Sequence, residues 1–364
     1  MQGWLASRLV LLTVMLAVAW AKGEPLSRIV QHWDADHFVA IATTGYTTLT
    51  ETAYFPGLPL VMAAFNMVGA PPALTGVLAS LAGSGMAAWA LYRLSGGGAA
   101  GAVAVLAWSF APMTVFTFVP YTEAVCCALA FWAFWHAKAD RWGLAAVCAA
   151  GACAFRVSGL FLIGALGLVG LLARRRADAP RFDWRRRLAR IAWLGLPTAV
   201  LAAYAIFLRV NFGSWTAWFE AQGQGWGRQF NWPWRAVDLT LRTAGVYDSA
   251  PLSPMAVIFC WEVAACLIGV AVTAWCLATK QIPEGGWVAS QLLALSCQVW
   301  LISLARSMVL WFPLFSFVGL VAATRVRNRV AAQVARLVGV LLFGCEVVCM
   351  VWWSAGYFSG AWSG

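Results

Sequence analysis

The chain has 364 residues, of which 62% are hydrophobic and only 11% are charged. Soluble domains usually carry about 25% charged residues, so this composition excludes an ordinary water-soluble domain. The net charge of +11 does not indicate nucleic-acid binding, because the arginines cluster in short loops between apolar runs. The sequence therefore predicts an integral membrane protein that contacts membrane lipids and no nucleic acid.

Apolar runs long enough to cross a bilayer recur along the whole chain. A span needs about 20 residues, and lipid leaves only helices or a closed barrel as spanning structures. The runs are continuous rather than alternating, which favours helices. We therefore predict an all-α fold, a polytopic transmembrane bundle of about eleven helices in one domain over residues 1–364. The predicted spans are 4–21, 57–70, 73–93, 99–118, 121–137, 143–173, 191–210, 253–279, 287–303, 308–324 and 337–355.

Two segments leave the helix count open. The run 143–173 is long and has Arg156 and Gly159 near its centre, so it forms either one span or two short helices. Residues 1–21 could be a cleaved signal peptide or a retained first helix. We favour the retained helix, because the polar segment that follows makes sense only if it is tethered to the membrane.

Two basic loops orient the chain. Lysine and arginine accumulate on the cytoplasmic side of membrane proteins, which assigns loops 174–190 and 325–336 to that side. The loops 22–55 and 211–252 then lie outside. The arginines that carry this assignment are Arg174, Arg175, Arg176, Arg181, Arg185, Arg186, Arg187 and Arg190 in the first basic loop, and Arg325, Arg327, Arg329 and Arg336 in the second.

The first outside loop holds an unusual polar cluster. It reads His32-Trp33-Asp34-Ala35-Asp36-His37-Phe38, so two carboxylates and two histidines come shortly before a helix enters the membrane. Polar groups beside a hydrophobic wall suit a reaction between amphipathic substrates. The alternative is an aspartate that caps a helix, with solvated neighbours.

The order of these residues resembles the PIG-V family. The pattern W-D-x-x-H-[FY]-x-x-I-A-x-x-G-Y followed by F-P-x-x-P occupies residues 33–46 and 55–59. Weaker family-like segments follow in order, so that the resemblance covers residues 30–320. They are Pro120-Tyr121-Thr122-Glu123-Ala124, Phe155-Arg156-Val157-Ser158-Gly159-Leu160, Phe212-Gly213 with Gln222 and Trp226, and Arg306 with Phe312-Pro313-Leu314-Phe315.

PIG-V proteins are the second mannosyltransferases of GPI-anchor assembly, with bacterial relatives. The resemblance implies a GT-C glycosyltransferase whose two outside loops form the active site. It implies transfer of mannose from a polyprenyl-phosphate-mannose donor to a lipid or lipoglycan acceptor on the extracytoplasmic or lumenal face. The outside loops are compact, and Tyr54 stands where the family usually has phenylalanine, a mild departure. The short, Ala- and Arg-rich chain suggests a bacterial relative in the plasma membrane. A eukaryotic member would lie in the endoplasmic reticulum.

The resemblance places the catalytic acid in the first outside loop, and the chemistry fits. An acceptor hydroxyl needs a carboxylate base to take its proton during attack, and we assign this role to Asp34, with Asp36 as its rival. His37 either hydrogen-bonds to the loop or the sugar, or lies on a helix surface. Asp34-Ala35-Asp36 also spells D-x-D, which in many glycosyltransferases binds a divalent metal. A monophosphate donor needs a metal less than a nucleotide diphosphate does, so we expect no cofactor.

Positive charge should stabilise the departing lipid phosphate. Arg156, Arg228 and Arg306 are the candidates. An arginine within an apolar run is costly and usually functional or paired, and on that argument Arg156 and Arg306 are the stronger pair. The alternative for each is a structural ion pair with Glu123 or Glu262. Glu123 could orient the site, although we prefer its pairing with Arg156.

The second outside loop and the Tyr121 segment complete the predicted site. Indole faces and amide side chains bind carbohydrates, which assigns Gln222 and Trp226 to the sugar. The alternative is an interfacial amphipathic helix with tryptophan anchors. Tyr121 and Glu123 are assigned to substrate binding. A transporter or flippase for a lipid-linked sugar is the main rival function, and a non-catalytic scaffold subunit is the second.

Overall fold

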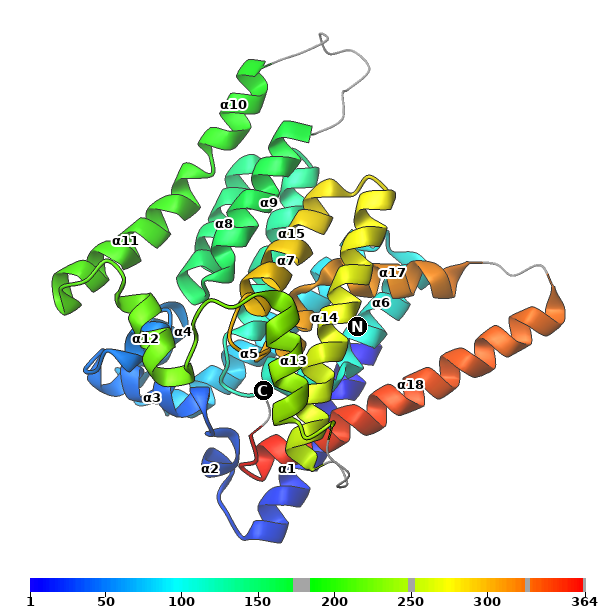
Figure 1. Cartoon of the computed structure of the whole chain (residues 1–364), viewed down its shortest axis with the longest axis horizontal. Coiled ribbons are helices and arrows are strands. Elements are labelled where there is room, and N and C mark those ends of the chain that lie inside the picture. Colours follow the sequence, from blue (N-terminus) through cyan, green and yellow to red (C-terminus); the bar gives the residue numbers. More distant parts are fainter. Residues whose placement is uncertain (173–183, 248–252, 325–327, 363–364) are drawn as a thin grey trace. The chain divides into compact units, whose positions relative to one another are not determined.

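The computed structural model describes residues 1–172, 184–247, 253–324 and 328–362 (Figure 1). Regular structure within these ranges is helical, apart from one isolated β-bridge between Phe230 and Gln298, so the all-α prediction is confirmed. The α-helices are α1 (Gln2–Lys22), α2 (Leu26–Val30), α3 (Asp34–Thr44), α4 (Gly57–Asn66), α5 (Pro72–Leu94), α6 (Gly98–Phe110), α7 (Glu123–Lys138), α8 (Trp142–Phe155), α9 (Ser158–Leu172), α10 (Trp184–Ala192), α11 (Gly195–Phe212), α12 (Ala217–Trp226), α13 (Pro233–Thr243), α14 (Pro254–Ala278), α15 (Ile282–Ser296), α16 (Leu304–Ser307), α17 (Phe312–Ala323) and α18 (Arg329–Phe358). Three short 3-10 helices are η1 (Thr50–Ala53), η2 (Pro112–Thr117) and η3 (Met308–Leu310).

The long apolar helices make the chain an integral membrane protein. In the part of the chain that the structure describes, five helical stretches are long and apolar enough to cross a membrane. They are Gln2–Lys22, Pro72–Leu94, Trp184–Phe212, Pro254–Ala278 and Arg329–Phe358. A sixth arises if Leu304–Leu310 and Phe312–Ala323, which are bent by 66°, form one span. The total of eleven spans stays a prediction.

Of the two alternatives for the run 143–173, the structure has two helices, α8 and α9, because the backbone of Arg156 is extended between them. Other predicted boundaries were wrong, for local reasons. The predicted span 99–118 ends at Phe110, since Pro112 begins a 3-10 turn. The basic segments 174–190 and 325–336 are not simply loops, because α10 begins at Trp184 and α18 begins at Arg329.

Some sequence predictions lie outside the described residues. Of the basic residues, Arg174, Arg175, Arg176, Arg181, Arg325 and Arg327 fall in this category, as do residues 248–252 of the second outside loop.

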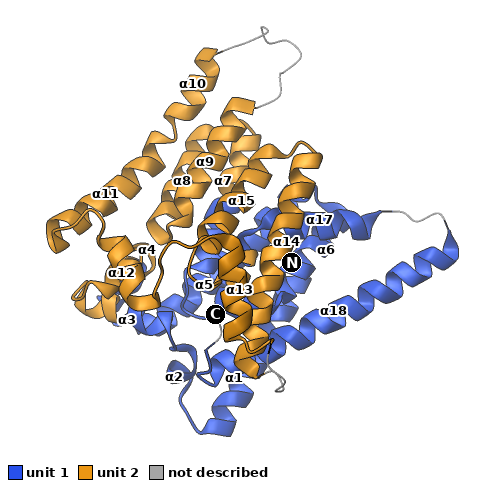
Figure 2. Cartoon of the chain, in the orientation of Figure 1, with its two compact units in different colours: residues 1–39, 61–131, 309–363 blue, residues 40–60, 132–308, 364 orange. Residues whose placement is uncertain are grey.

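The chain forms two compact units (Figure 2). Unit 1 comprises Met1–Val39, Val61–Phe131 and Val309–Ser363, and unit 2 comprises Ala40–Leu60, Trp132–Met308 and Gly364. In unit 1, α17 packs closely on α6, where a side chain at Gly319 would collide with the Ala100 carbonyl. In unit 2, α8 packs on α11, and α15 packs on α9 and α14.

Candidate active site

The start of α3 in unit 1 carries the predicted general base. Asp34 and Asp36 both lie in the first turn of this helix, where the exposed N–H groups favour negative charge. Trp33, directly before Asp34, has a φ of 57°, the left-handed conformation that is costly for a residue other than glycine. Its indole Nε1 donates a hydrogen bond to the Ala361 carbonyl at 3.2 Å. The C-terminal segment therefore helps to hold this strained turn.

Two buried tyrosines fix the residue before that turn. The Tyr357 hydroxyl lies 3.2 Å from the His32 carbonyl and 3.1 Å from the Val30 carbonyl. The Tyr121 hydroxyl lies 3.4 Å from the same His32 carbonyl, and the two tyrosine rings meet edge to face at 5.8 Å. Tyr121, predicted to bind substrate, thus supports the backbone that leads to Asp34.

His32 belongs to this arrangement, and sequence reasoning gave it no role. Its ring packs against Tyr357 at 5.8 Å. Burial lowers the pKa of His32 against the opposing effect of a hydrogen bond with the Phe358 backbone, so the neutral imidazole is favoured at neutral pH. The sequence shows that His32 directly precedes Trp33 in the polar cluster. No motif in the last helix indicated a role for Tyr357.

The two aspartates occupy different environments. Asp34 is half-buried, whereas Asp36 is exposed and accepts a hydrogen bond from the Gln31 amide at 3.0 Å. Residues two apart in a helix point about 200° away from each other, so a helical D-x-D does not direct both carboxylates at one ion. Among the described residues, no group of three or more His, Cys, Asp or Glu side chains is arranged to hold a metal ion. His37, one turn along, is half-buried.

Glu123 lies at the first residue of α7 and is fully buried. It belongs to unit 1, together with Tyr121 and Asp34, whereas Arg156 belongs to unit 2. The pairing of Glu123 with Arg156 stays a prediction.

In unit 2, the second outside loop packs on the second half of the first. The Thr52 hydroxyl donates to the Ala217 carbonyl at 3.2 Å, and the Trp218 indole donates to the Ala53 carbonyl at 3.2 Å. The ring of Trp226 meets Tyr54 edge to face at 5.7 Å. Helix α12 therefore packs on η1, and the contact with Tyr54 restricts the orientation of the Trp226 ring.

The rest of the second outside loop presents aromatic side chains to its surroundings. Exposed large rings in this segment are Trp215, Phe219, Phe230, Trp232, Trp234 and Tyr247. The rings of Trp232 and Trp234 stack at 5.0 Å. Such side chains are typical of the membrane interface, so the interfacial alternative describes these positions well. Gln222 and Trp226 differ from them, because both are half-buried.

The three candidate arginines all lie in unit 2 at helix ends or breaks, and all are half-buried. Arg156 caps the C-terminus of α8 in an extended conformation. Arg228 follows α12, and its backbone N–H donates to the Gln222 carbonyl at 3.3 Å. Arg306 lies in the short helix α16.

Glu262 on α14 organises the turn that carries Arg306. Its fully buried carboxylate accepts three backbone hydrogen bonds, from Ser303 at 3.0 Å, Leu304 at 2.7 Å and Ala305 at 2.9 Å. Ser303 has a φ of 63°, so a second left-handed residue precedes a candidate functional side chain. The sequence offered Glu262 as one of two possible ion-pair partners of the candidate arginines, and that pairing stays a prediction. The structure shows that Glu262 holds the backbone of the turn that carries Arg306.

No protein-family model and no curated protein matches this chain. Among solved structures, it is similar to the oligosaccharyltransferase of Archaeoglobus fulgidus in the apo form, with a TM-score of 0.47 and 11% identity over 98% of this chain. The present chain spans only 56% of the length of that archaeal chain. It is also similar to ArnT from Cupriavidus metallidurans bound to undecaprenyl phosphate, with a TM-score of 0.48, 14% identity and coverage of 97% of this chain and 76% of that one. A likeness at this level assigns no activity to the chain.

Proposed function

We propose that this protein is a membrane glycosyltransferase of the GT-C type. It transfers mannose from polyprenyl-phosphate-mannose to a lipid or lipoglycan acceptor on the extracytoplasmic face. The observation that carries the proposal is the geometry around Asp34, the aspartate of the PIG-V-like motif. A strained Trp33 and two buried tyrosine hydroxyls fix the backbone leading to a half-buried carboxylate. Backbone strain of this kind clusters at functional sites.

In the proposed reaction, Asp34 takes the proton of the acceptor hydroxyl as its oxygen attacks the anomeric carbon of mannose. The bond from that carbon to the phosphate oxygen breaks, and polyprenyl phosphate leaves with the electron pair. Attack from the opposite side inverts the configuration, so a β-linked donor gives an α-linked product. No covalent intermediate with the protein is needed.

Arginine side chains supply the charge that the leaving phosphate requires. Arg306 is the first candidate, because the Glu262 carboxylate holds its turn through three backbone N–H groups. Arg156 and Arg228 are the other two. A guanidinium can bind two phosphate oxygens at once, which stabilises the negative charge that develops as the bond breaks.

The sugar contacts are assigned to α12. The T-shaped contact with Tyr54 restricts the orientation of Trp226, and we assign the indole to stacking against the C–H face of mannose. Gln222 lies one helical turn before Trp226, so both side chains lie on the same face of α12. Its amide can donate and accept hydrogen bonds with sugar hydroxyls.

The proposal is tested with purified protein in liposomes that contain bacterial lipid extract as acceptor. Radiolabelled polyprenyl-phosphate-mannose, polyprenyl-phosphate-glucose and GDP-mannose are supplied in separate reactions. The proposal predicts a new labelled glycolipid from the first donor only. A labelled lipid formed only from GDP-mannose would contradict the proposal that the donor is a lipid phosphate. Transfer only from the glucose donor would contradict the proposal that the transferred sugar is mannose. Movement of the donor between leaflets with no new glycolipid would instead favour the flippase.

A further inference from the structure

A second polar site lies in unit 2, and its lining includes none of the residues assigned to transfer. An open pocket of about 810 Å³ is formed where the turn between α7 and α8, the end of α9, the helix α10 and the turn between α14 and α15 meet. Helix α8 separates it from Arg156, since Trp142 begins that helix near the pocket and Arg156 ends it. At a rise of 1.5 Å per residue, this helix is about 20 Å long.

The pocket has an excess of positive charge. Its charged lining comprises the cations Lys138, Arg186, Arg190 and Lys280 and the carboxylates Asp140 and Glu284. Two positive charges therefore remain uncompensated among the lining residues. The four cations come from three separate parts of the chain, so the fold itself concentrates them.

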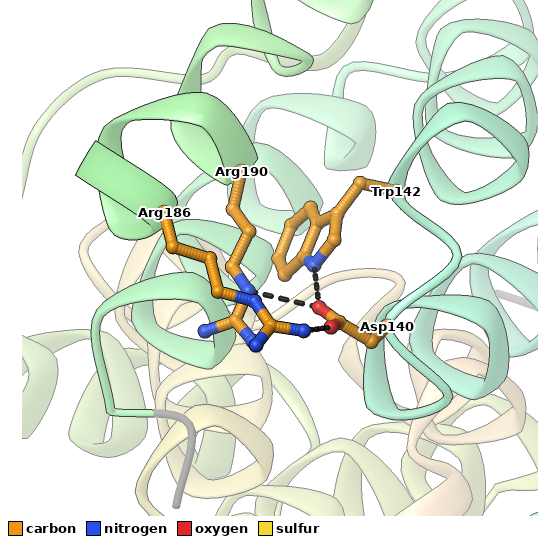
Figure 3. A network of polar contacts seen from close by, with 4 residues as sticks. All are labelled: Asp140, Trp142, Arg186 and Arg190. Atoms are coloured by element: carbon orange, nitrogen blue, oxygen red, sulfur yellow. Dashed lines mark hydrogen bonds and ion pairs between the residues drawn. The ribbon is translucent and has the colours of Figure 1, made fainter. Parts of the chain in front are cut away.

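Asp140 sets the orientation of the two arginines (Figure 3). Its carboxylate accepts hydrogen bonds from Arg186, from Arg190 Nε at 2.9 Å and from the Trp142 indole at 3.0 Å. Partial burial acts to raise the pKa of the Asp140 carboxyl, but these hydrogen bonds outweigh it and lower the pKa. Each guanidinium carries five N–H donors, and the carboxylate holds the two groups side by side.

The lysines contribute differently. Lys138 is paired with the buried carboxylate of Glu284. Lys280 follows α14 in a left-handed turn with a φ of 61°, and its ammonium has no ion-pair partner within the described ranges of the chain. Lys280 therefore adds a positive charge to the pocket that no ion pair among the described residues neutralises.

Apolar side chains lie on the same elements as the pocket. Trp184 and Leu188 are exposed one turn apart on α10, the helix that supplies Arg186 and Arg190. Leu172 and Ile282, which line the pocket, are also exposed. A helix with arginines on one side and tryptophan and leucine on the other is typical of the membrane interface. Basic pockets between membrane helices bind the headgroups of anionic lipids.

We propose that this pocket binds the phosphate headgroup of an anionic phospholipid, with the acyl chains lying against the neighbouring apolar residues. The paired guanidinium groups of Arg186 and Arg190 contact the phosphate oxygens, and Lys280 adds an ammonium from the opposite turn. None of these residues is assigned to the transfer reaction, so the site is independent of the proposed enzyme activity.

The test measures lipid binding to the full-length protein by native mass spectrometry from detergent, with phosphatidylglycerol and phosphatidylcholine as probes. Wild type is expected to retain phosphatidylglycerol in preference to phosphatidylcholine. Lys280→Gln should weaken phosphatidylglycerol binding about fivefold, the order expected for one cation near an anionic headgroup. Arg235→Gln, which removes an exposed arginine on α13, is the matched control and should bind like wild type.

Three results would overturn the proposal. The first is equal retention of the two lipids by wild type. The second is an equal loss of binding in Lys280→Gln and Arg235→Gln, which would mean that only net charge matters. The third is full displacement of phosphatidylglycerol by an equal concentration of inorganic phosphate, which would make the pocket a soluble-phosphate site. Lys280→Gln breaks no ion pair among the described residues, so it should fold and leave each of these outcomes interpretable.

Discussion

The start of α3 and the turn before α16 both join an acidic side chain to a strained backbone, but they do so in opposite ways. At α3, tyrosine hydroxyls hold the backbone and the Asp34 carboxylate is half-buried. At α16, the Glu262 carboxylate is itself the holding group, fully buried and bonded to three backbone N–H groups. A carboxylate committed to three donors is a poor base. The contrast therefore separates an acid suited to chemistry from one suited to positioning.

The largest effect should come from removing the positioning acid. Glu262→Ala leaves three buried N–H groups without their acceptor, and each such group costs about 1–3 kcal/mol. We expect a loss of at least ~3 kcal/mol in the free energy of unfolding, together with loss of transfer. Thermal unfolding in detergent measures the first effect. Unfolding at the wild-type temperature would show that Glu262 does not hold the turn.

A milder change at the same region should sharpen the result. Glu262→Gln keeps one oxygen that can accept from Leu304 and Ala305, so its stability should fall between wild type and Glu262→Ala. If Arg306 is positioned through the backbone, transfer should follow stability across the two variants. Transfer abolished in a fully stable Glu262→Gln would instead point to a direct role for the carboxylate.

Removing a hydroxyl of the tyrosine clamp, the pair Tyr121 and Tyr357 that contacts the backbone before α3, should give the next largest effect. Tyr357→Phe removes the hydroxyl whose single proton is shared between the Val30 and His32 carbonyls, which should lower the free energy of unfolding by about 1–3 kcal/mol. The loosened turn should reduce kcat about tenfold with little change in KM, because the orientation of the base is lost while substrate contacts remain. Tyr121→Phe breaks the longer bond of 3.4 Å and should have the smaller effect. A reversed order would contradict the clamp.

Loss of the proposed sugar contact should act on binding instead. Trp226→Ala removes the indole face, which should raise KM for the donor about tenfold, as expected for a stacking contact of 1–1.5 kcal/mol. Trp232→Ala, an exposed ring in the same loop, is the control and should leave KM unchanged. Equal changes in both variants would assign Trp226 to the membrane interface.

The smallest effect on stability should come from a change at a third carboxylate, Asp140. Hydrogen bonds from arginine lower the pKa of its carboxyl below the ordinary value of 3.8. The stability it contributes should therefore be present above pH 3.8 and be lost as the pH falls through the lowered folded pKa. Because the side chain is 37% exposed, we expect less than about 1 kcal/mol. Asp140→Asn should remove this acid-dependent step in thermal unfolding, and an unchanged step would place its origin elsewhere.

The helical fold could be predicted from the sequence, because continuous apolar runs long enough to cross a bilayer indicate membrane helices. The break at Arg156 could also be foreseen, since a charged residue beside Gly159 interrupts a run that is too long for one span. The helical content of α10 was missed, because its many arginines were counted as a loop signal rather than as one face of a helix.

The candidate site could be predicted only in part. Asp34 stands out through its motif. The substrate contact assigned to Tyr121 stays a prediction, and the structure places the Tyr121 hydroxyl against the His32 carbonyl. The hydrogen bond from Tyr357 to His32 joins residues 325 positions apart, and no local pattern reports such a contact. The same holds for Glu262, whose acceptor role depends on a turn more than 40 residues further along the chain. The left-handed conformation of Trp33 likewise could not be predicted from the tryptophan itself or from the residues next to it in the sequence.

The central claim is that Asp34, and not its exposed neighbour, takes the proton of the acceptor. The most direct measurement compares initial rates of mannose transfer for wild type, Asp34→Asn and Asp36→Asn, each checked for wild-type thermal stability. Our account predicts a loss of about 10²-fold or more for Asp34→Asn, the range for removing a general base, and near-wild-type rates for Asp36→Asn. Equal rates for wild type and Asp34→Asn, or a large loss confined to Asp36→Asn, would contradict it.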